Sequence, residues 1–385
     1  MPAQQHSSAG KVVASSMSAL IRPVYLEVNL SQLKRNLEAI RAHVAPAKVM
    51  PMVKANGYGH GVDGVAPFIE PYVDYFGVAL AEEGIHLRRL GVSKPILVAG
   101  GTLPEQAPLF AEYDLTLTGS SPELLDAAEQ VARQTGKRIK THLKIDTGME
   151  RVGVHEYEAE GLILKAAACR HLDVEGIYTH LANSELADRS FSLMQLERFS
   201  EALHVYERLS LPLPPLRHVC NSGGILNLPQ AHFEMVRPGI LFYGIYPGAE
   251  AERAVEVRPA LTWHARVSYS KRIRPGRTVS YGSLWQAQAE SRIVTIPCGY
   301  GDGYFRRMTN RARVLIRGKE YPQVGRICMD QFMVNVGDDE IGVGEDVILL
   351  GGGIRAEDLA EWTGTNEYEV LTNISARVPR VYLRE

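Results

Sequence analysis

Residues 48–61 read KVMPMVKANGYGHG, and this stretch contains the structural unit that recurs through the first two-thirds of the chain. A short apolar run ends at Lys54, and a glycine-rich segment follows it. Short apolar runs bounded by glycine are typical of buried strands, whereas apolar residues at three- and four-residue spacing are typical of helices. The stretch therefore predicts a buried strand that leads into a tight turn.

Similar strand-like runs occur on both sides of this stretch, with amphipathic segments between them. The runs are 24–30, 48–54, 74–80, 95–100, 114–118, 138–146, 173–180, 217–221 and 235–244. Helix-like segments include 31–44, 121–134 and 189–209, and we expect Ser31 and Ser121 to start the first two. About eight βα repeats over roughly 230 residues match the size of a (β/α)8 TIM barrel. A doubly wound open sheet is the alternative, but a GxGxxG motif follows none of the predicted strands.

The chain changes character after about residue 255. Short runs rich in Val, Ile, Tyr and Thr, separated by Gly, Pro and Asn, predict a mostly β domain. These runs are 261–273, 292–299, 312–318, 321–336 and 346–353. We therefore predict an α/β protein with a flexible tail over 1–22, a barrel over 23–250 and a C-terminal mostly β domain over 251–385.

Composition narrows the possible partners. The 385 residues include 42 Lys and Arg against 44 Asp and Glu, a net charge of −2, so no basic excess favours nucleic acid or an anionic membrane. No apolar run approaches the roughly 18 residues that span a bilayer. The four cysteines, Cys169, Cys220, Cys298 and Cys328, form no CxxC pair. This spacing favours reduced thiols in the cytoplasm over a disulfide framework or a metal site.

Two strand ends carry basic residues that suit an active site, because barrels place their sites at the carboxyl ends of the strands. Lys54 ends the second predicted strand. Burial lowers the pKa of an ammonium and makes the amine a Schiff-base nucleophile, although a strand-end lysine can also extend into solvent. Arg151 follows the sixth predicted strand, seven residues after Lys144, and a guanidinium there can bind a carboxylate bidentately. The alternative is a loop arginine paired with Asp146 or Glu150.

Polar residues also follow the last predicted strands. His180 ends the run 173–180, where a structural role is the alternative to a catalytic one. Ser222 and the backbone N–H groups near Gly239 and Ile240 lie where barrels often bind phosphate. A helix cap at Ser222 and a turn at Gly239 are the alternatives.

Taken together, these motifs resemble those of the alanine racemase family, whose members are pyridoxal-5′-phosphate enzymes with an N-terminal barrel and a C-terminal β domain. In the barrel the resemblance rests on VKANGYGHG (53–61), KIDTGMERVG (144–153), CNSGG (220–224) and VRPGILFYG (236–244). In the second domain it rests on SYGSLW (280–285), GYGDGY (299–304), VGRICMDQFMV (324–334) and NEYEVLTNISARVPRVY (366–382). The resemblance covers nearly the whole chain after residue 20, and the order of the segments makes it specific.

The resemblance implies an enzyme that interconverts L- and D-alanine by a two-base mechanism and supplies D-alanine for peptidoglycan synthesis. Lys54 would hold pyridoxal 5′-phosphate as a covalent aldimine and act as one base, and Tyr281 would act as the other on the opposite face. Arg151 and Met329 would bind the substrate. The expected cofactor-binding residues, besides Lys54, are Tyr58, His180, Ser222, Arg237, Gly239, Ile240 and Tyr368.

The family also implies roles for supporting residues. Arg237 distinguishes the racemases from the barrel-type decarboxylases, because a guanidinium only donates hydrogen bonds and so pairs with an unprotonated ring nitrogen. His218 would support Arg237. Lys144 lies where some racemases carry a carbamylated lysine that positions the substrate arginine, so we predict carbamylation. Asp330, together with Tyr300 and Arg306, is expected to brace or line the entrance.

Tyr281 and Met329 would reach the barrel of the other subunit, so the resemblance implies a head-to-tail homodimer with shared active sites. The expected substrate is alanine, and no metal, nucleic acid or membrane partner is expected. A serine or broad-specificity racemase, a non-catalytic pyridoxal-phosphate carrier without the β domain, and a lysine-dependent aldolase barrel are the alternatives. Two positions depart from the family pattern: Glu150 replaces a small residue, and Gly301 replaces a common alanine.

Overall fold

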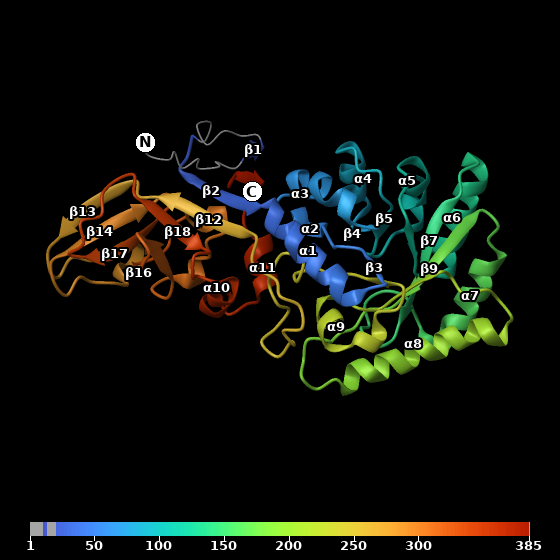
Figure 1. Ribbon diagram of the computed structural model, residues 1–385. Helices are drawn as coiled ribbons and strands as arrows, with labels where there is room; N and C mark the ends of the chain where they lie inside the picture. The colour runs from blue at the N-terminus through green and yellow to red at the C-terminus, as the bar shows by residue number, and fades with distance from the viewer. Residues whose placement is uncertain (1–10, 14–20, 385) are drawn as a thin grey trace, which may run out of the picture. The chain divides into compact units, whose positions relative to one another are not determined.

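The computed structural model describes residues 11–13 and 21–384, and the chain divides into two compact units (Figure 1). The barrel unit comprises residues 33–57 and 62–258. The β unit combines the described residues among 11–32 with 58–61 and with 259–384. None of the helices among the described residues is both long and apolar enough to cross a membrane.

The barrel unit contains a closed ring of eight strands, which confirms the predicted (β/α)8 barrel. The strands are β3 (Lys48–Val49), β4 (Phe76–Val78), β5 (Ile96–Val98), β6 (Leu117–Gly119), β7 (Ile139–Asp146), β9 (Leu172–Tyr178), β10 (Leu216–His218) and β11 (Met235–Val236). Parallel pairing or single parallel bridges connect them in the order β11, β3, β4, β5, β6, β7, β9, β10. The Arg237 N–H donates to the Cys220 carbonyl at 2.9 Å and links the ends of β11 and β10. Strand β8 (Val154–His155) pairs with the end of β7.

The prediction that residues 24–30 form the first barrel strand was wrong. Strand β2 (Val24–Asn29) pairs antiparallel with β12 (Leu261–Arg266) and parallel with β19 (Arg380–Arg384), in the sheet of the β unit. Its burial alternates along the strand, whereas β4 and β5 are buried at every position. Alternation is typical of a sheet with one buried face, and continuous burial is typical of a parallel barrel. The strands that precede Lys54 and Arg151 are therefore the first and the fifth of the barrel.

Helices surround the barrel strands (Figure 1). They are α1 (Leu30–Val44), α3 (Val62–Ile69), α4 (Ala81–Arg89), α5 (Ala107–Glu112), α6 (Pro122–Thr135), α7 (Ala159–Ala168), α8 (Ser190–Arg208) and α9 (Ser222–Asn227). Ser121 caps α6 as predicted, since its side chain accepts from the Leu124 N–H. Ser31 does not start α1, because the helix begins at Leu30 and Asn29, two residues before Ser31, accepts from the Gln32 N–H through its Oδ1 at 2.7 Å.

The β unit contains a ten-stranded sheet in the order β1, β19, β2, β12, β18, β15, β16, β17, β14, β13 (Figure 1). Its other strands are β1 (Lys11–Val13), β13 (Tyr269–Ile273), β14 (Ser291–Ile296), β15 (Arg313–Ile316), β16 (Lys319–Val324), β17 (Phe332–Gly337) and β18 (Asp346–Leu350), with helices α10 (Ala356–Thr363) and α11 (Glu367–Thr372). Trp263, Tyr304 and Phe332 pack together in its core. The predicted C-terminal mostly β domain is therefore confirmed.

The predicted tail, 1–22, lies largely outside the described residues. Within it, β1 pairs antiparallel with β19, and Arg22 forms an ion pair with the buried Asp302 at 2.7 Å.

Candidate active site

Five predicted site residues lie at the carboxyl ends of barrel strands, which meet at one end of a barrel. Lys54 comes shortly after β3, Lys144 lies near the end of β7, and His180 follows β9. His218 ends β10, and Arg237 directly follows β11. Burial holds the pKa of His180 well below its usual value, and the positive charges of Arg237, Arg151, Lys144 and Lys54 lower it further. This end of the barrel is therefore strongly cationic, and His180 is neutral.

The chain turns sharply in the left-handed sense directly after Lys54. Ala55, Asn56, Gly57 and Tyr58, all in the short helical segment α2 (Lys54–Tyr58), have φ between 50° and 60°. Residues other than glycine adopt this conformation at a cost of about 1–2 kcal/mol each, so outside contacts must stabilise it. Glu83 supplies such a contact, because its Oε1 accepts from the Ala55 N–H at 2.6 Å. Its Oε2 accepts from the Ala79 and Leu80 N–H groups at 2.8 and 3.1 Å, which ties the turn to the end of β4.

Lys54 is partly buried. Burial lowers its pKa, the nearby Arg151 lowers it further, and Glu83 partly opposes the shift. A lowered pKa increases the fraction of neutral amine, which is the form that acts as a base or nucleophile. The lysine is therefore suited to both roles predicted for it.

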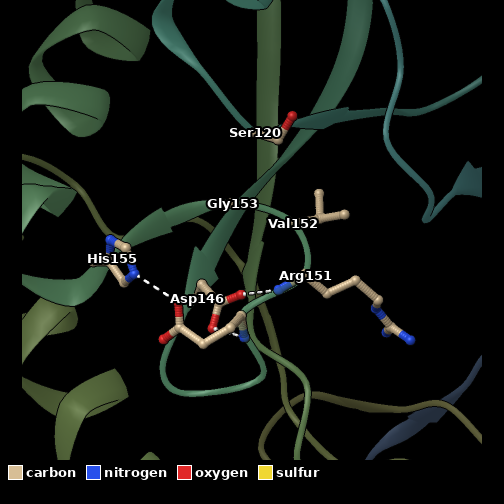
Figure 2. A pocket seen from close by; sticks show the side chains of 7 residues that line it. Ser120, Asp146, Arg151, Val152, Gly153 and His155 are labelled. Carbon is tan, nitrogen blue, oxygen red and sulfur yellow. Dashed lines mark hydrogen bonds and ion pairs between the residues drawn. The ribbon is translucent and has the colours of Figure 1, made fainter.

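The loop that carries Arg151 folds around a single carboxylate (Figure 2). Asp146 Oδ1 accepts from the Gly148, Met149 and Glu150 N–H groups at 2.9, 2.9 and 3.1 Å, and Oδ2 accepts from the Arg151 N–H at 2.9 Å. Burial alone would raise the pKa of Asp146, but these hydrogen bonds outweigh it and lower the pKa. The carboxylate therefore stays ionised and holds the loop.

Because Asp146 binds the backbone, it does not pair with the Arg151 guanidinium. Glu150 pairs instead with His155 at 3.0 Å, so its departure from the family pattern does not neutralise Arg151. Arg151 is exposed and borders a pocket of about 360 Å³, together with Ser120, Asp146 and Gly153 among others (Figure 2). The alternative of a loop arginine paired with Asp146 or Glu150 was therefore wrong.

Lys144 is almost completely buried, with 4% of its surface exposed. Its Nζ donates to the Ile145 carbonyl at 2.8 Å and lies 5.3 Å from the centre of the Tyr178 ring. Burial lowers the pKa of Lys144 to about 7, Arg237 and Arg151 lower it too, and Asp146 opposes the shift. Near neutrality about half of this amine is therefore uncharged.

Arg237 is buried and donates hydrogen bonds to neutral groups. Its Nη2 donates to the Thr179 and Val219 carbonyls at 2.8 and 3.0 Å and lies 3.2 Å from His180 Nδ1. Its Nη1 donates to His218 Nδ1 at 2.9 Å, as expected for a supporting histidine. Burial lowers the pKa of Arg237 only to about 10, so it remains charged near neutrality.

The predicted phosphate residues lie next to one another in the barrel unit. Ser222 Oγ accepts from the Gly239 N–H at 2.9 Å and from the Leu241 N–H at 3.3 Å. Its lone pairs are then occupied, and its hydroxyl hydrogen can be donated to a further acceptor. Asn221 caps α9 instead of Ser222, since its side chain accepts from the Gly224 N–H at 3.0 Å. Ser222 is therefore not the helix cap.

The remaining predicted residues belong to the β unit. Tyr281 begins a 3₁₀ turn (Tyr281–Ser283) and is 70% exposed, and Met329 is 53% exposed. Asp330 pairs with Arg377 at 2.7 Å. The rings of Tyr58 and Tyr368 lie 6.1 Å apart between centroids. Their roles, and those of Tyr300 and Arg306, remain predictions.

Two family models match the chain in succession: the N-terminal domain of alanine racemase over residues 28–247 and its C-terminal domain over residues 260–382. The chain belongs to the alanine racemase family. The alanine racemase of Carboxydothermus hydrogenoformans is 42% identical over 370 residues, covering 94% of this chain and 100% of the relative. That of Desulfovibrio desulfuricans is 40% identical over 371 residues, covering 95% and 100%.

Solved alanine racemases share the fold. The enzyme of Clostridium difficile 630 matches with a TM-score of 0.91 at 35% identity, covering 95% of this chain and 97% of that one. The enzyme of Bacillus anthracis, solved with bound L-Ala-P, matches with a TM-score of 0.89 at 33% identity, covering 95% and 96%. These matches confirm the predicted alanine racemase activity, and the family uses pyridoxal phosphate. The carrier alternative was wrong, because the C-terminal racemase domain is present, and so was the aldolase alternative.

Sequence reasoning missed the positioning roles of Glu83 and Asp146. Asp146 precedes a Thr-Gly turn, and an aspartate at a turn commonly binds backbone N–H groups. Glu83 occupies the third position of α4, where a glutamate typically accepts from the backbone at the start of its own helix. Its second bond, to Ala55, had no sequence signal because the two residues are 28 positions apart.

Proposed function

We propose that this alanine racemase moves the α-proton of alanine between Lys54 and Tyr281, with Arg151 and the backbone of Met329 binding the substrate carboxylate. The observation that best supports the proposal is the buried cationic environment of Lys54, which lowers the pKa of its amine. A neutral amine accepts a proton readily, and a nearby guanidinium suits the carboxylate of an amino acid.

The barrel residues fit pyridoxal phosphate. Four contacts occupy Nη1 and Nη2 of Arg237, while its Nε–H is not used by them and can donate to an unprotonated ring nitrogen. The hydroxyl of Ser222 can donate to phosphate, and we assign the Ile240 N–H, with Tyr58 and Tyr368, to the same group. The Gly239 N–H, which donates to Ser222 Oγ in this structure, would turn to the phosphate when the cofactor binds. His180 would lie beside the ring. When bound, the cofactor delocalises the electron pair left by the departing α-proton.

The proposal is tested by adding pyridoxal phosphate to the purified enzyme and following the optical rotation of L-alanine and L-serine. We expect protein-bound cofactor in the visible absorbance spectrum and rapid loss of rotation with L-alanine. Serine differs by one hydroxyl, and a pocket discriminates such a group by about a hundredfold. A protein that binds the cofactor but acts equally on both amino acids would favour the broad-specificity alternative.

We also propose that Lys144 is carbamylated. The neutral amine forms a bond to the carbon of CO2, one C–O electron pair moves to oxygen, and a proton leaves to solvent. The product is an anion near Arg237 and Arg151, whose guanidinium groups form no ion pair with a carboxylate among the contacts described for them. The carbamate attracts the two arginines, whereas the ammonium form of Lys144 would repel them.

Carbamylation should depend on pH because only the neutral amine reacts. With a pKa of about 7, the amine becomes neutral as the pH rises through 7, so carbamate should accumulate above this pH and be lost below it. Carbon-13 NMR with labelled bicarbonate is expected to show one protected carbamate signal. The signal should be absent in Lys144→Arg and present in Lys140→Arg, a control on the same strand. A wild-type protein that shows no carbamate signal above pH 7 in the presence of labelled bicarbonate would contradict the proposal.

The proposed homodimer rests on exposed apolar side chains of the β unit. Tyr281, Leu284, Tyr300 and Met329 are each between 41% and 70% exposed, and such surfaces commonly mark interfaces. Mixing Lys54→Ala chains with Tyr281→Phe chains, each of which is expected to lose most of its activity, tests a shared site. Random exchange gives about a quarter of the sites an intact pair when the two residues come from different subunits. Sedimentation that shows a fully active monomer, or mixing that restores no activity, would contradict it.

The location of the enzyme remains a proposal too. All four cysteines are free thiols, which supports the reducing cytoplasm.

A further inference from the structure

A row of hydrogen-bonded polar side chains crosses the interior of the barrel, where apolar side chains usually pack. It begins at Arg237, whose Nη1 lies 2.9 Å from His218 Nδ1. His218 Nε2 lies 2.8 Å from His142 Nδ1, and His142 Nε2 lies 3.4 Å from Glu175 Oε1. Both histidines are completely buried, whereas 19% of the Glu175 side chain is exposed. The row therefore connects the buried guanidinium of Arg237 to the carboxylate of Glu175, which lies on β9.

The direction of every hydrogen bond in this row follows from Arg237. A guanidinium can only donate, so His218 Nδ1 must accept and its Nε2 must carry the proton. That proton is donated to His142 Nδ1, which leaves the proton of His142 on Nε2, directed at Glu175. Burial lowers the pKa of both histidines, and Arg237 lowers them further. Glu175 opposes the shift at His142, but burial outweighs it, so both rings stay neutral. Both rings therefore have one defined tautomer.

Glu175 is the carboxylate at the end of the row. Burial alone would raise its pKa, but hydrogen bonds from His142 and from the Tyr75 hydroxyl outweigh burial and lower the pKa. The carboxylate is therefore ionised near neutrality. Arg237 forms no ion pair among the hydrogen bonds described for it, and a buried charge without compensation is unstable. Glu175 supplies the opposite charge through two polarised imidazoles.

We propose that Glu175 and His142 are positioning residues that hold Arg237, through His218, in one orientation with its charge compensated. The consequence for catalysis rests on the proposed function, in which Arg237 faces the cofactor ring. Glu175 then sets how strongly the guanidinium donates to that ring, although it touches neither cofactor nor substrate. His218 without His142 would not hold Arg237 in place. Its ring could then change tautomer and carry the proton on Nδ1, and two donors would face each other.

The tautomers can be tested directly in the full-length protein, with and without pyridoxal phosphate. Long-range ¹H–¹⁵N correlation spectra of histidine-labelled enzyme distinguish protons on Nδ1 from protons on Nε2, and His142→Asn assigns the two signals. We expect both His142 and His218 to carry a single proton on Nε2. An Nδ1 proton or a doubly protonated ring at either position near neutral pH would overturn the proposal, whether or not the cofactor binds.

Glu175→Gln removes the charge and keeps a carbonyl acceptor. We expect a shift of the His142 Nε2–H signal and a fall in kcat of about tenfold in both directions, with KM little changed, because the lost bond is charged. Glu129→Gln is the matched control, since Glu129 accepts from the His171 ring at 2.7 Å elsewhere in the same unit. Equal effects of the two variants would overturn the proposal.

If Glu175→Gln does not fold, Tyr75→Phe is the second variant. This change removes one hydrogen-bond donor to the Glu175 carboxylate and keeps the carboxylate itself. A stronger bond from His142 is then expected, seen as a downfield shift of its Nε2–H signal. An unchanged signal would overturn the proposal. Confirmed tautomers with a kcat as insensitive to Glu175→Gln as to Glu129→Gln would overturn the positioning role of Glu175 and leave the proposed function of Arg237 intact.

Discussion

Replacement of Lys54 by alanine is expected to abolish racemisation in both directions, with a loss of at least about 10⁴-fold in kcat. The reason is that one side chain has two roles. The amine both anchors the cofactor and exchanges one of the two α-protons, so no other group described at this end of the barrel replaces it. Optical rotation with L-alanine and with D-alanine measures the loss in each direction.

Lys48→Ala is the matched control for this experiment. Lys48 begins the same strand, β3, and its side chain is exposed at the opposite end. We expect the control to retain near-wild-type activity and cofactor absorbance. A Lys54→Ala enzyme whose activity stays within about a hundredfold of wild type would show that another group removes the proton.

Replacement of Tyr281 by phenylalanine should give a loss of about 10²–10⁴-fold, the range of a positioned general acid–base group. The change removes one hydroxyl and keeps the ring. Two enantiomers have equal free energies, so kcat/KM must fall by the same factor in both directions. A difference between the two directions is instead expected in kcat and in KM taken separately. The largest difference is expected in the exchange of the α-proton with solvent.

Exchange in heavy water separates the two bases. With Lys54 intact, one enantiomer of alanine should still exchange its α-proton with solvent in the Tyr281→Phe enzyme, while the other exchanges slowly. Tyr269→Phe is the control, because Tyr269 is another exposed tyrosine of the β unit, on strand β13. Equal exchange of both enantiomers, or equal small losses of kcat in both directions, would contradict the two-base mechanism.

The positions of the main site residues were predictable because each lies in a local pattern. Lys54, His180 and Arg237 end or directly follow short apolar runs, and parallel strands bring such ends together whatever the rest of the chain does. The chemistry of each side chain is also local, since a guanidinium donates and a buried amine loses its proton in any fold. Fold class and the likeness to the racemases could be inferred from these patterns.

Other features depended on contacts between distant residues. The run 24–30 has the pattern of a strand before a helix, but only its pairing with residues 261–265 and 380–383 assigns it to the β unit. The helix start is a local case: Asn29 and Ser31 are both residue types that cap helices, and the Gln32 N–H donates to Asn29, three positions away. The local sequence allowed strand 24–30 in either unit and long-range pairing selected one, whereas the helix start was a choice between two neighbouring capping residues.

The sequence by itself determined which groups are available: an amine after β3, a guanidinium after β11 and a second guanidinium in the loop after β7. Tertiary structure alone decided their state and orientation. Lys144 reaches a pKa of about 7 through burial beside two arginines, and the tautomers of His142 and His218 follow from a carboxylate and a guanidinium at opposite ends of one row. The physical reason is that desolvation and hydrogen-bond direction depend on neighbours in space, which spacing along the chain does not specify.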